Sequence, residues 1–220
     1  MSRPGGKTPH LGVPPELQLP TAGLNQVRHH AVLGHGLAVQ AIRARGRADT
    51  RVSFAENGRR GPGHRHARIR QGRRDRRREL DAPFLTVMLE GRYTDGYLAA
   101  AGSDVPKFPD EDLTAIGSPV DFAGINVYRP NVYVAPSGQP PGYRTIPISA
   151  SHPKMASAWH VFDPEVMYWA PRQVTSLWGP KSIFITENGC ATADAVSEEG
   201  NIYDSDRVMF LRAVGSSHPY

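Results

Sequence analysis

The chain has 220 residues, of which 39% are hydrophobic and 21% charged, a balance that suits a globular protein with one sizeable core. It contains no run of 18 apolar residues and no apolar leader stretch, so we expect no membrane span and no secretory signal. Its one cysteine, Cys190, cannot form an intrachain disulfide, and we expect a cytoplasmic location. The positive net charge of +5 comes from one segment, because residues 58–78 contain ten Arg and one Asp and carry a charge of +9. The rest of the chain has a net charge of −4.

The first predicted element follows an irregular segment rich in proline and glycine. Apolar residues recur at steps of three and four and predict an amphipathic helix of about 20 residues: Leu24, Val27, Ala31, Leu33 or Gly34, Leu37, Ala38, Ala41 and Ile42. Arg43 and Arg45 lie in its last turn, where cations suit the helix dipole, and Gly46 is the expected stop. Residues 50–55 then alternate like a short strand.

The Arg-rich segment 58–78 has no apolar stripe that could pack against a core, and it is expected to be aberrant or disordered. Patterned sequence resumes at Asp81, and a turn region follows at 90–93. The remaining predicted elements are a buried strand at 121–128, a proline-rich loop at 136–153, a helix from Asp163 to about Trp178, a buried strand at 181–187, and a helix from Asp204 through Ala213 that the tail from Gly215 does not continue.

The alternation of helices with three strands predicts parallel strands joined by crossover helices. On topology alone, this order fits either part of a (β/α)8 barrel or a small doubly wound sheet.

Two strand ends carry polar residues. Glu187 ends an apolar run and precedes Asn-Gly, and in parallel α/β folds active sites lie at the carboxyl ends of strands. The alternative is a strand-end Glu that accepts hydrogen bonds from loop amides. Asn126 and Tyr128 are two residues apart, so they share one face of their strand. They could equally be polar groups that satisfy nearby backbone.

Taken together, these segments resemble glycoside hydrolase family 1, the β-glucosidase-like enzymes. The segment ITENG at 185–189 is similar to the family's nucleophile signature, and DFAGINVY at 121–128 is similar to its Asp-Phe-(Ile/Leu)-Gly-(Ile/Leu)-Asn-Tyr-Tyr strand. Three further segments match in the same order: NQVRHHAVLGH at 25–35, Trp159 with VFDPE at 161–165, and DSDR at 204–207. The resemblance covers about residues 9–57 and 79–213.

The resemblance implies a partial (β/α)8 TIM barrel, comprising about strands five to seven with flanking helices, and residues 1–220 as one incomplete glycosidase domain. It implies hydrolysis of β-glucosides or oligosaccharides by double displacement, without cofactor or metal. Glu187 would be the nucleophile, Tyr128 would hydrogen-bond and orient it, and Asn126 would bind substrate. A second carboxyl group would lie ~5–5.5 Å away, as retaining glycosidases require.

The chain departs from the family at several points. It contains no Asn-Glu dipeptide of the acid/base motif, and Glu56 and Glu90, the nearest alternatives, match no family position. Val127 replaces an aromatic residue and is expected to point away from the site. Segment 58–78 stands where the family has an amphipathic helix. We attribute it to compensating frame errors in a GC-rich gene, an idea that natural peptides from 58–78 would contradict.

Other interpretations remain. The chain could be a catalytically inactive fragment of the same family, or a nucleic-acid-binding protein that uses its Arg run, although no aromatic residue interleaves that run. A metal site at His29, His30 and His35 is not predicted, because helix geometry points the first two about 100° apart. Cys190 is expected to be a small buried hydrophobe, and Gly61-x-Gly63 follows no phosphate-binding strand.

Overall fold

The computed structural model describes residues 19–47, 49–56, 78–79, 81–130, 133–136, 143–180 and 182–217. The predictions for the first 18 residues and for the Arg-rich segment 58–78, apart from Arg78, lie outside these ranges. Within them, no helix combines the length and the apolar character that crossing a bilayer requires.

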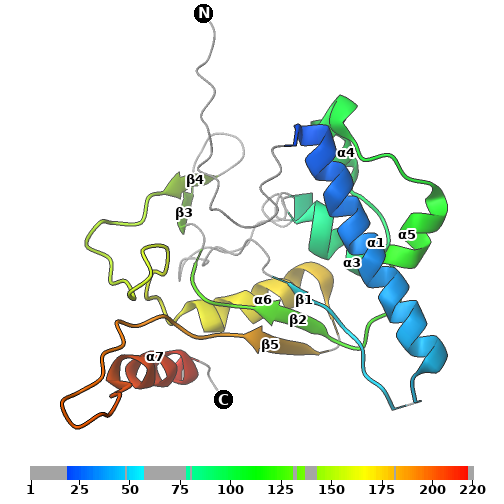
Figure 1. Cartoon of the computed structure of the whole chain (residues 1–220). Helices are drawn as coiled ribbons and strands as arrows, with labels where there is room; N and C mark the ends of the chain where they lie inside the picture. The colour runs from blue at the N-terminus through cyan, green and yellow to red at the C-terminus, as the bar shows by residue number, and fades with distance from the viewer. Residues whose placement is uncertain are drawn as a thin grey trace, which may run out of the picture.

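A three-stranded parallel sheet forms the centre of the fold, in the order β1-β2-β5 (Figure 1). The strands are β1 (Ala55–Glu56), β2 (Ala123–Asn126) and β5 (Ile183–Glu187). Three parallel strands were predicted from the alternation of elements, and the sheet confirms them. The first strand was placed too early, because the strand pairing begins only at Ala55.

Glycine at position 124 lets β1 and β2 approach each other. A Cβ atom at Gly124 would lie 2.0 Å from the carbonyl oxygen of Phe54, so no larger residue fits without moving β1. Because β2 is the central strand and all four of its residues are buried, the spacing of the sheet depends on this position.

The first long helix, α1 (Thr21–Arg45), has 25 residues, more than the 20 or so that were predicted, and it ends before Gly46 as predicted. It buries a different face from the one that its apolar periodicity indicated. Its apolar residues Leu24, Val27, Leu37 and Ile42 are between 40% and 53% exposed. The residues that it buries are Asn25, His29, Val32, Gly36 and Val39. Polar groups therefore take part in the packing of this helix.

His29 is the centre of that packing. Its side chain is fully buried, with Nδ1 3.0 Å from the Tyr93 hydroxyl and Nε2 2.9 Å from Asp112 Oδ2. The ring also stacks on Phe108 at 5.0 Å between centroids. The histidine thus joins α1 to the segment around α5 by hydrogen bonds and ring contacts.

Residues 82–116 form short helices for which the sequence analysis assigned no elements. They are a π-helical turn η1 (Ala82–Thr86), α3 (Val87–Glu90), α4 (Asp95–Ala101), a 3₁₀ turn η2 (Gly102–Asp104) and α5 (Asp110–Ile116). Helix α1 packs along α5 and against η1 and η2. Each helix is too short to show a clear apolar period.

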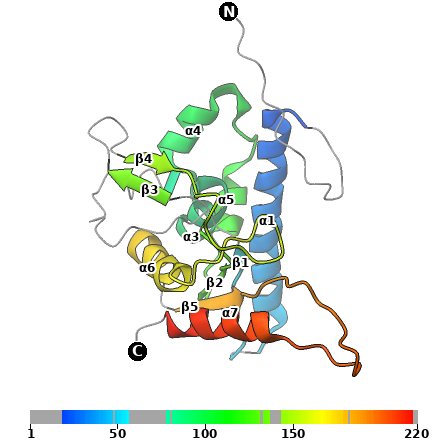
Figure 2. The same ribbon diagram turned by 90° about the vertical axis from the view of Figure 1, so that its left-hand side faces the viewer.

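A two-stranded antiparallel sheet lies apart from the parallel sheet in both views (Figures 1 and 2). It pairs β3 (Tyr133–Pro136) with β4 (Tyr143–Ile146). The prediction of a continuous loop at 136–153 was therefore wrong at Pro136 and at Tyr143–Ile146, which belong to strands. Proline at both ends of the segment led to the prediction of a loop in place of the hairpin.

The last helices are α6 (Val166–Trp178) and α7 (Ser205–Ser216). Helix α6 ends where predicted but begins later, because Asp163 Oδ1 accepts a hydrogen bond from the amide of Glu165 in a turn before the helix. Helix α7 begins after Asp204 as predicted and continues beyond Ala213 through Gly215, so the predicted stop was wrong.

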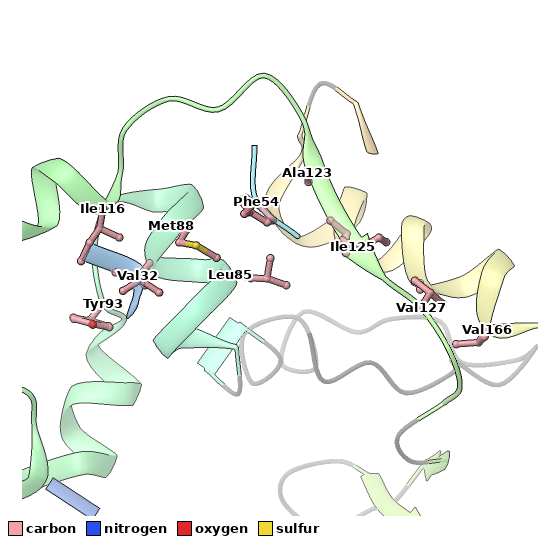
Figure 3. Packing of buried hydrophobic residues seen from close by; sticks show 13 residues of the cluster. Val32, Phe54, Leu85, Met88, Tyr93, Ile116, Ala123, Ile125, Val127 and Val166 are labelled. Carbon is pink, nitrogen blue, oxygen red and sulfur yellow. The ribbon is translucent and has the colours of Figure 1, made fainter. Parts of the chain in front are cut away.

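The hydrophobic core lies between the parallel sheet and the helices (Figure 3). Leu85 and Ile125 are fully buried, Phe54 is 8% exposed, and Val127 lies close to Val166 on α6. Strand β5 is different, because among the described residues it pairs on one side only and its Phe184 is 49% exposed. The prediction of a buried strand at 181–187 was wrong for this reason.

Candidate functional site

The carboxyl ends of β2 and β5 lie side by side. Ile125 pairs with Ile185, but the next pair joins Asn126 to Glu187, so Thr186 is an extra residue in β5. Such a bulge changes the direction of the side chains that follow it. Glu187 ends the strand as an exposed side chain at the end of the sheet where parallel α/β proteins place their sites.

Tyr128 and Glu187 contact each other directly at this edge. The Tyr128 hydroxyl donates a hydrogen bond of 2.7 Å to Glu187 Oε2. That bond, together with partial burial and the negative charge of Glu187, raises the pKa of the Tyr128 phenol above its ordinary value. The phenol therefore keeps its proton at neutral pH and can orient the carboxylate.

Asn126 is the register partner of Glu187, but its side chain has a different partner. Its Oδ1 accepts a hydrogen bond of 2.7 Å from Thr186 Oγ1, and the residue is 8% exposed. Strand β2 ends at Asn126, so Tyr128 lies beyond the strand. The expectation that both side chains share one face of a strand was therefore wrong, although both lie at the same end of the sheet.

Backbone contacts hold the segment that carries Tyr128. The amide of Val127 donates to the Glu187 carbonyl oxygen at 2.9 Å, and Asn188 Nδ2 donates to the Val127 carbonyl oxygen at 2.7 Å. The Val127 side chain is 3% exposed and belongs to the core, so it points away from Glu187 as predicted.

Three residues near Tyr128 were not assigned a site role from sequence. The Trp159 ring lies edge-on to Tyr128 at 6.1 Å between centroids and is 51% exposed, and the Arg129 guanidinium lies 5.8 Å from the Trp159 ring centre. His160 is 1% exposed and lies 3.1 Å from the Tyr128 carbonyl oxygen. Trp159 was identifiable only as part of a motif, and nothing in the sequence indicated His160.

The two alternative acids lie elsewhere. Glu90 ends α3 and pairs with Arg78 and with Arg92, away from the ends of β2 and β5. Glu56 ends β1, two strands from Glu187, and two strand spacings put their backbones ~10 Å apart.

The histidines of α1 have separate environments. His29 is buried against Tyr93 and Asp112, His30 lies 3.0 Å from Gln26, and His35 packs edge-on to Phe54. Over the described ranges, no three histidine, cysteine or acidic residues gather as a metal site would require. Cys190 was expected to be a small buried hydrophobe, but it is only partly buried. Burial nevertheless raises the pKa of its thiol.

Comparison with known proteins places these features in a family. The family model for Glycosyl hydrolase family 1 matches residues 9–214. The thermostable β-glucosidase B of Thermobispora bispora is 29% identical over 93% of this chain and 42% of its own length. The 1,4-β-D-glucan glucohydrolase of Thermotoga neapolitana is 33% identical over 59% of this chain and 30% of its own length.

A solved structure, the β-glucosidase from Thermotoga maritima in complex with castanospermine, matches 90% of this chain and 44% of its own, with a TM-score of 0.69 and 24% identity. This likeness shows that the fold is part of a (β/α)8 barrel, as predicted. The chain spans less than half the length of each of these proteins. With a family match over nearly all of its residues, the chain belongs to glycosyl hydrolase family 1.

Proposed function

We propose that the chain supplies the nucleophile of a retaining β-glucosidase site, with Glu187 as the attacking carboxylate. The observation that carries this proposal is the 2.7 Å hydrogen bond from Tyr128 to Glu187 at the carboxyl ends of two parallel strands. A nucleophilic carboxylate must stay ionised and oriented, and a neutral phenol donor serves both needs.

In the proposed reaction, one oxygen of Glu187 attacks the anomeric carbon of a β-glucoside. The bond from that carbon to the leaving oxygen breaks, and a covalent glycosyl-enzyme forms. Water then attacks the same carbon, the second carboxyl group (now a carboxylate) takes the proton of that water, and the bond to Glu187 breaks to release the sugar and the free carboxylate. Two displacements at one carbon return the original configuration, which makes the enzyme a retaining one.

Substrate contacts are assigned to the surroundings of Glu187. Asn126 pairs with Glu187 in the strand register and accepts a hydrogen bond from Thr186. The exposed Trp159 ring stands beside Tyr128 and offers a flat apolar face to a sugar ring. β-Glucosides are chosen as the substrate class because the relatives are named as β-glucosidases and as a glucan glucohydrolase.

The acid that protonates the leaving oxygen comes from a second carboxyl group. The chain has no Asn-Glu dipeptide, and its β1 acid, Glu56, lies two strands away. We therefore assign the acid to the portion of the barrel that the relatives have and this chain does not span. Without it, the chain should act only on glucosides whose leaving group needs no protonation.

A second candidate is a family member that binds sugars without reacting with them. The absence of the acid motif favours it. The two candidates differ in one outcome, which is whether Glu187 forms a covalent bond to an activated sugar.

The test is covalent labelling with 2,4-dinitrophenyl 2-deoxy-2-fluoro-β-glucoside. Its dinitrophenolate leaving group departs without protonation by an acid. Intact-mass and peptide analysis should find the fluoroglucosyl group on Glu187. The Glu187→Gln variant should not be labelled, whereas Glu198→Gln, which changes an exposed Glu in the following loop, should be labelled as the unmodified chain is. An unlabelled Glu187 in folded protein would favour the non-reacting alternative.

A further inference from the structure

We propose that His160 is a positioning residue that holds the backbone of Tyr128 and thereby aims its phenol at Glu187. Its importance for catalysis rests on the proposed function, whereas its effect on Tyr128 can be measured without any reaction. Neither the family match nor the predicted motifs assign a role to this histidine.

The contact itself is specific. His160 Nε2 lies 3.1 Å from the Tyr128 carbonyl oxygen. A carbonyl oxygen only accepts hydrogen bonds, so Nε2 carries the hydrogen and donates. Burial lowers the pKa of His160. The hydrogen bond to the Tyr128 backbone raises it and the nearby Arg129 lowers it, so the net change is downward and the ring is neutral at neutral pH.

The ring is held firmly enough to act as a fixed donor. It stacks on Trp159 with centroids 4.9 Å apart and planes 7° from parallel, and it meets Phe210 of α7 edge-on at 5.4 Å. Its backbone is also held, because the amide of Met155 donates to the His160 carbonyl oxygen at 2.9 Å. With 1% of the residue exposed, the ring has little room to turn.

Tyr128 needs such a donor because it lies outside the sheet. Strand β2 ends at Asn126, and the hydrogen bonds from Val127 to Glu187 and from Asn188 to Val127 hold the preceding residue. The bond from His160 holds the Tyr128 peptide itself. The phenol then reaches Glu187 from a backbone that is anchored on both sides of Tyr128.

Three substitutions separate hydrogen bonding from packing. In His160→Gln, the amide nitrogen can occupy the place of Nε2 and donate. In His160→Leu, an apolar side chain fills the space of the ring, and the N–H donor is lost. In His160→Asn, a donor is present on a side chain too short to reach Tyr128, so this variant decides the matter if the Leu variant does not fold.

The measured quantity is the pKa of Tyr128, which is obtained by an NMR titration of protein whose tyrosines carry ¹³C at Cζ. The Tyr128 resonance is assigned as the one that is lost in Tyr128→Phe. The bond to Glu187 raises the Tyr128 pKa, so breaking it should move the pKa down toward the ordinary value of about 10. We expect this fall in the Leu and Asn variants and none in the Gln variant. Far-UV circular dichroism confirms folding at each pH.

His152→Leu is the matched control. His152 lies in the same segment and its Nε2 is 3.2 Å from a backbone carbonyl oxygen, but that carbonyl belongs to Phe162. The control should leave the Tyr128 titration unchanged. The proposal is overturned if Tyr128 titrates alike in the unmodified chain and in a folded Leu or Asn variant, or if the Gln variant loses the raised pKa as they do. Failure of Glu187 labelling would overturn only the proposed function.

Discussion

Glu187 and Tyr128 are 59 residues apart in the sequence, and their contact depends on a single extra residue in β5. The sequence identifies both residues, because each follows an apolar strand and matches a family motif. It does not reveal the bulge at Thr186, because an extra residue in one strand shows only against the register of its partner. It also misses His160, whose proposed role rests on a hydrogen bond to the backbone carbonyl of Tyr128, 32 residues away.

Replacing Tyr128 by Phe should slow the labelling of Glu187 about tenfold. A hydrogen bond to a charged group contributes roughly 1.5–3 kcal/mol, and we expect the lower end because Glu187 is exposed to water. The rate constant of labelling, measured by intact mass over time, tests this. Tyr203→Phe removes a hydroxyl from a side chain that is 70% exposed and should change nothing. Equal rates in the two variants would show that the phenol has no influence on Glu187.

The elements show where periodicity misleads. Helix α1 was predicted as a helix that ends before Gly46, because its propensity and end signals are local, but the face that it buries is set by its neighbours. Gly36 lies on that face, and a Cβ there would come 2.1 Å from the Ala115 carbonyl oxygen on α5. The close approach of two helices selects a small residue that an apolar pattern counts as neutral.

Two glycines of α1 should respond to alanine in opposite ways. Gly36→Ala should lower the free energy of unfolding by about 1–3 kcal/mol, because the added methyl forces α1 and α5 apart. Gly34→Ala should raise it by about 0.5–1 kcal/mol, because Gly34 is exposed with nothing within 4 Å and alanine favours the helix. Urea unfolding of both variants tests the pair. Destabilisation by both would mean that α1 packs differently from this description.

At the scale of the whole molecule, buried histidines make stability depend on pH. Burial lowers the pKa of His35 and of His160 below the value of 6.5 that unfolded histidine has. Below pH 6.5 the unfolded chain therefore binds protons that the folded chain does not, and the free energy of unfolding falls. Asp194 affects the free energy of unfolding only at lower pH, since hydrogen bonds from Arg207 and Thr192 lower its pKa to about 2.

The free energy of unfolding should therefore be lower at pH 5 than at pH 7.5, as measured by urea unfolding at both values. His160→Gln removes one of the two groups and should reduce the difference. A chain whose unfolding free energy is the same or higher at pH 5 would contradict a neutral, buried state of these histidines.

Sequence reasoning was most successful for long segments and least for short ones. The parallel strands, the helix α1 and the C-terminal end of α6 were predictable because apolar runs and stop signals extend over many residues. The short helices between residues 82 and 116 and the β3–β4 hairpin were not, because a four- to seven-residue element shows too few periods to differ from a loop.

By itself, the sequence determined the family, the parallel α/β class and the identity of the candidate residues Glu187, Tyr128 and Asn126, because these depend on local runs and on the order of motifs. Only the tertiary structure decided which face of α1 is buried, how Thr186 shifts β5, and that His160 contacts Tyr128. Those features arise from contacts between segments far apart in the chain. Their energies depend on distance in space, which no local pattern of residues records.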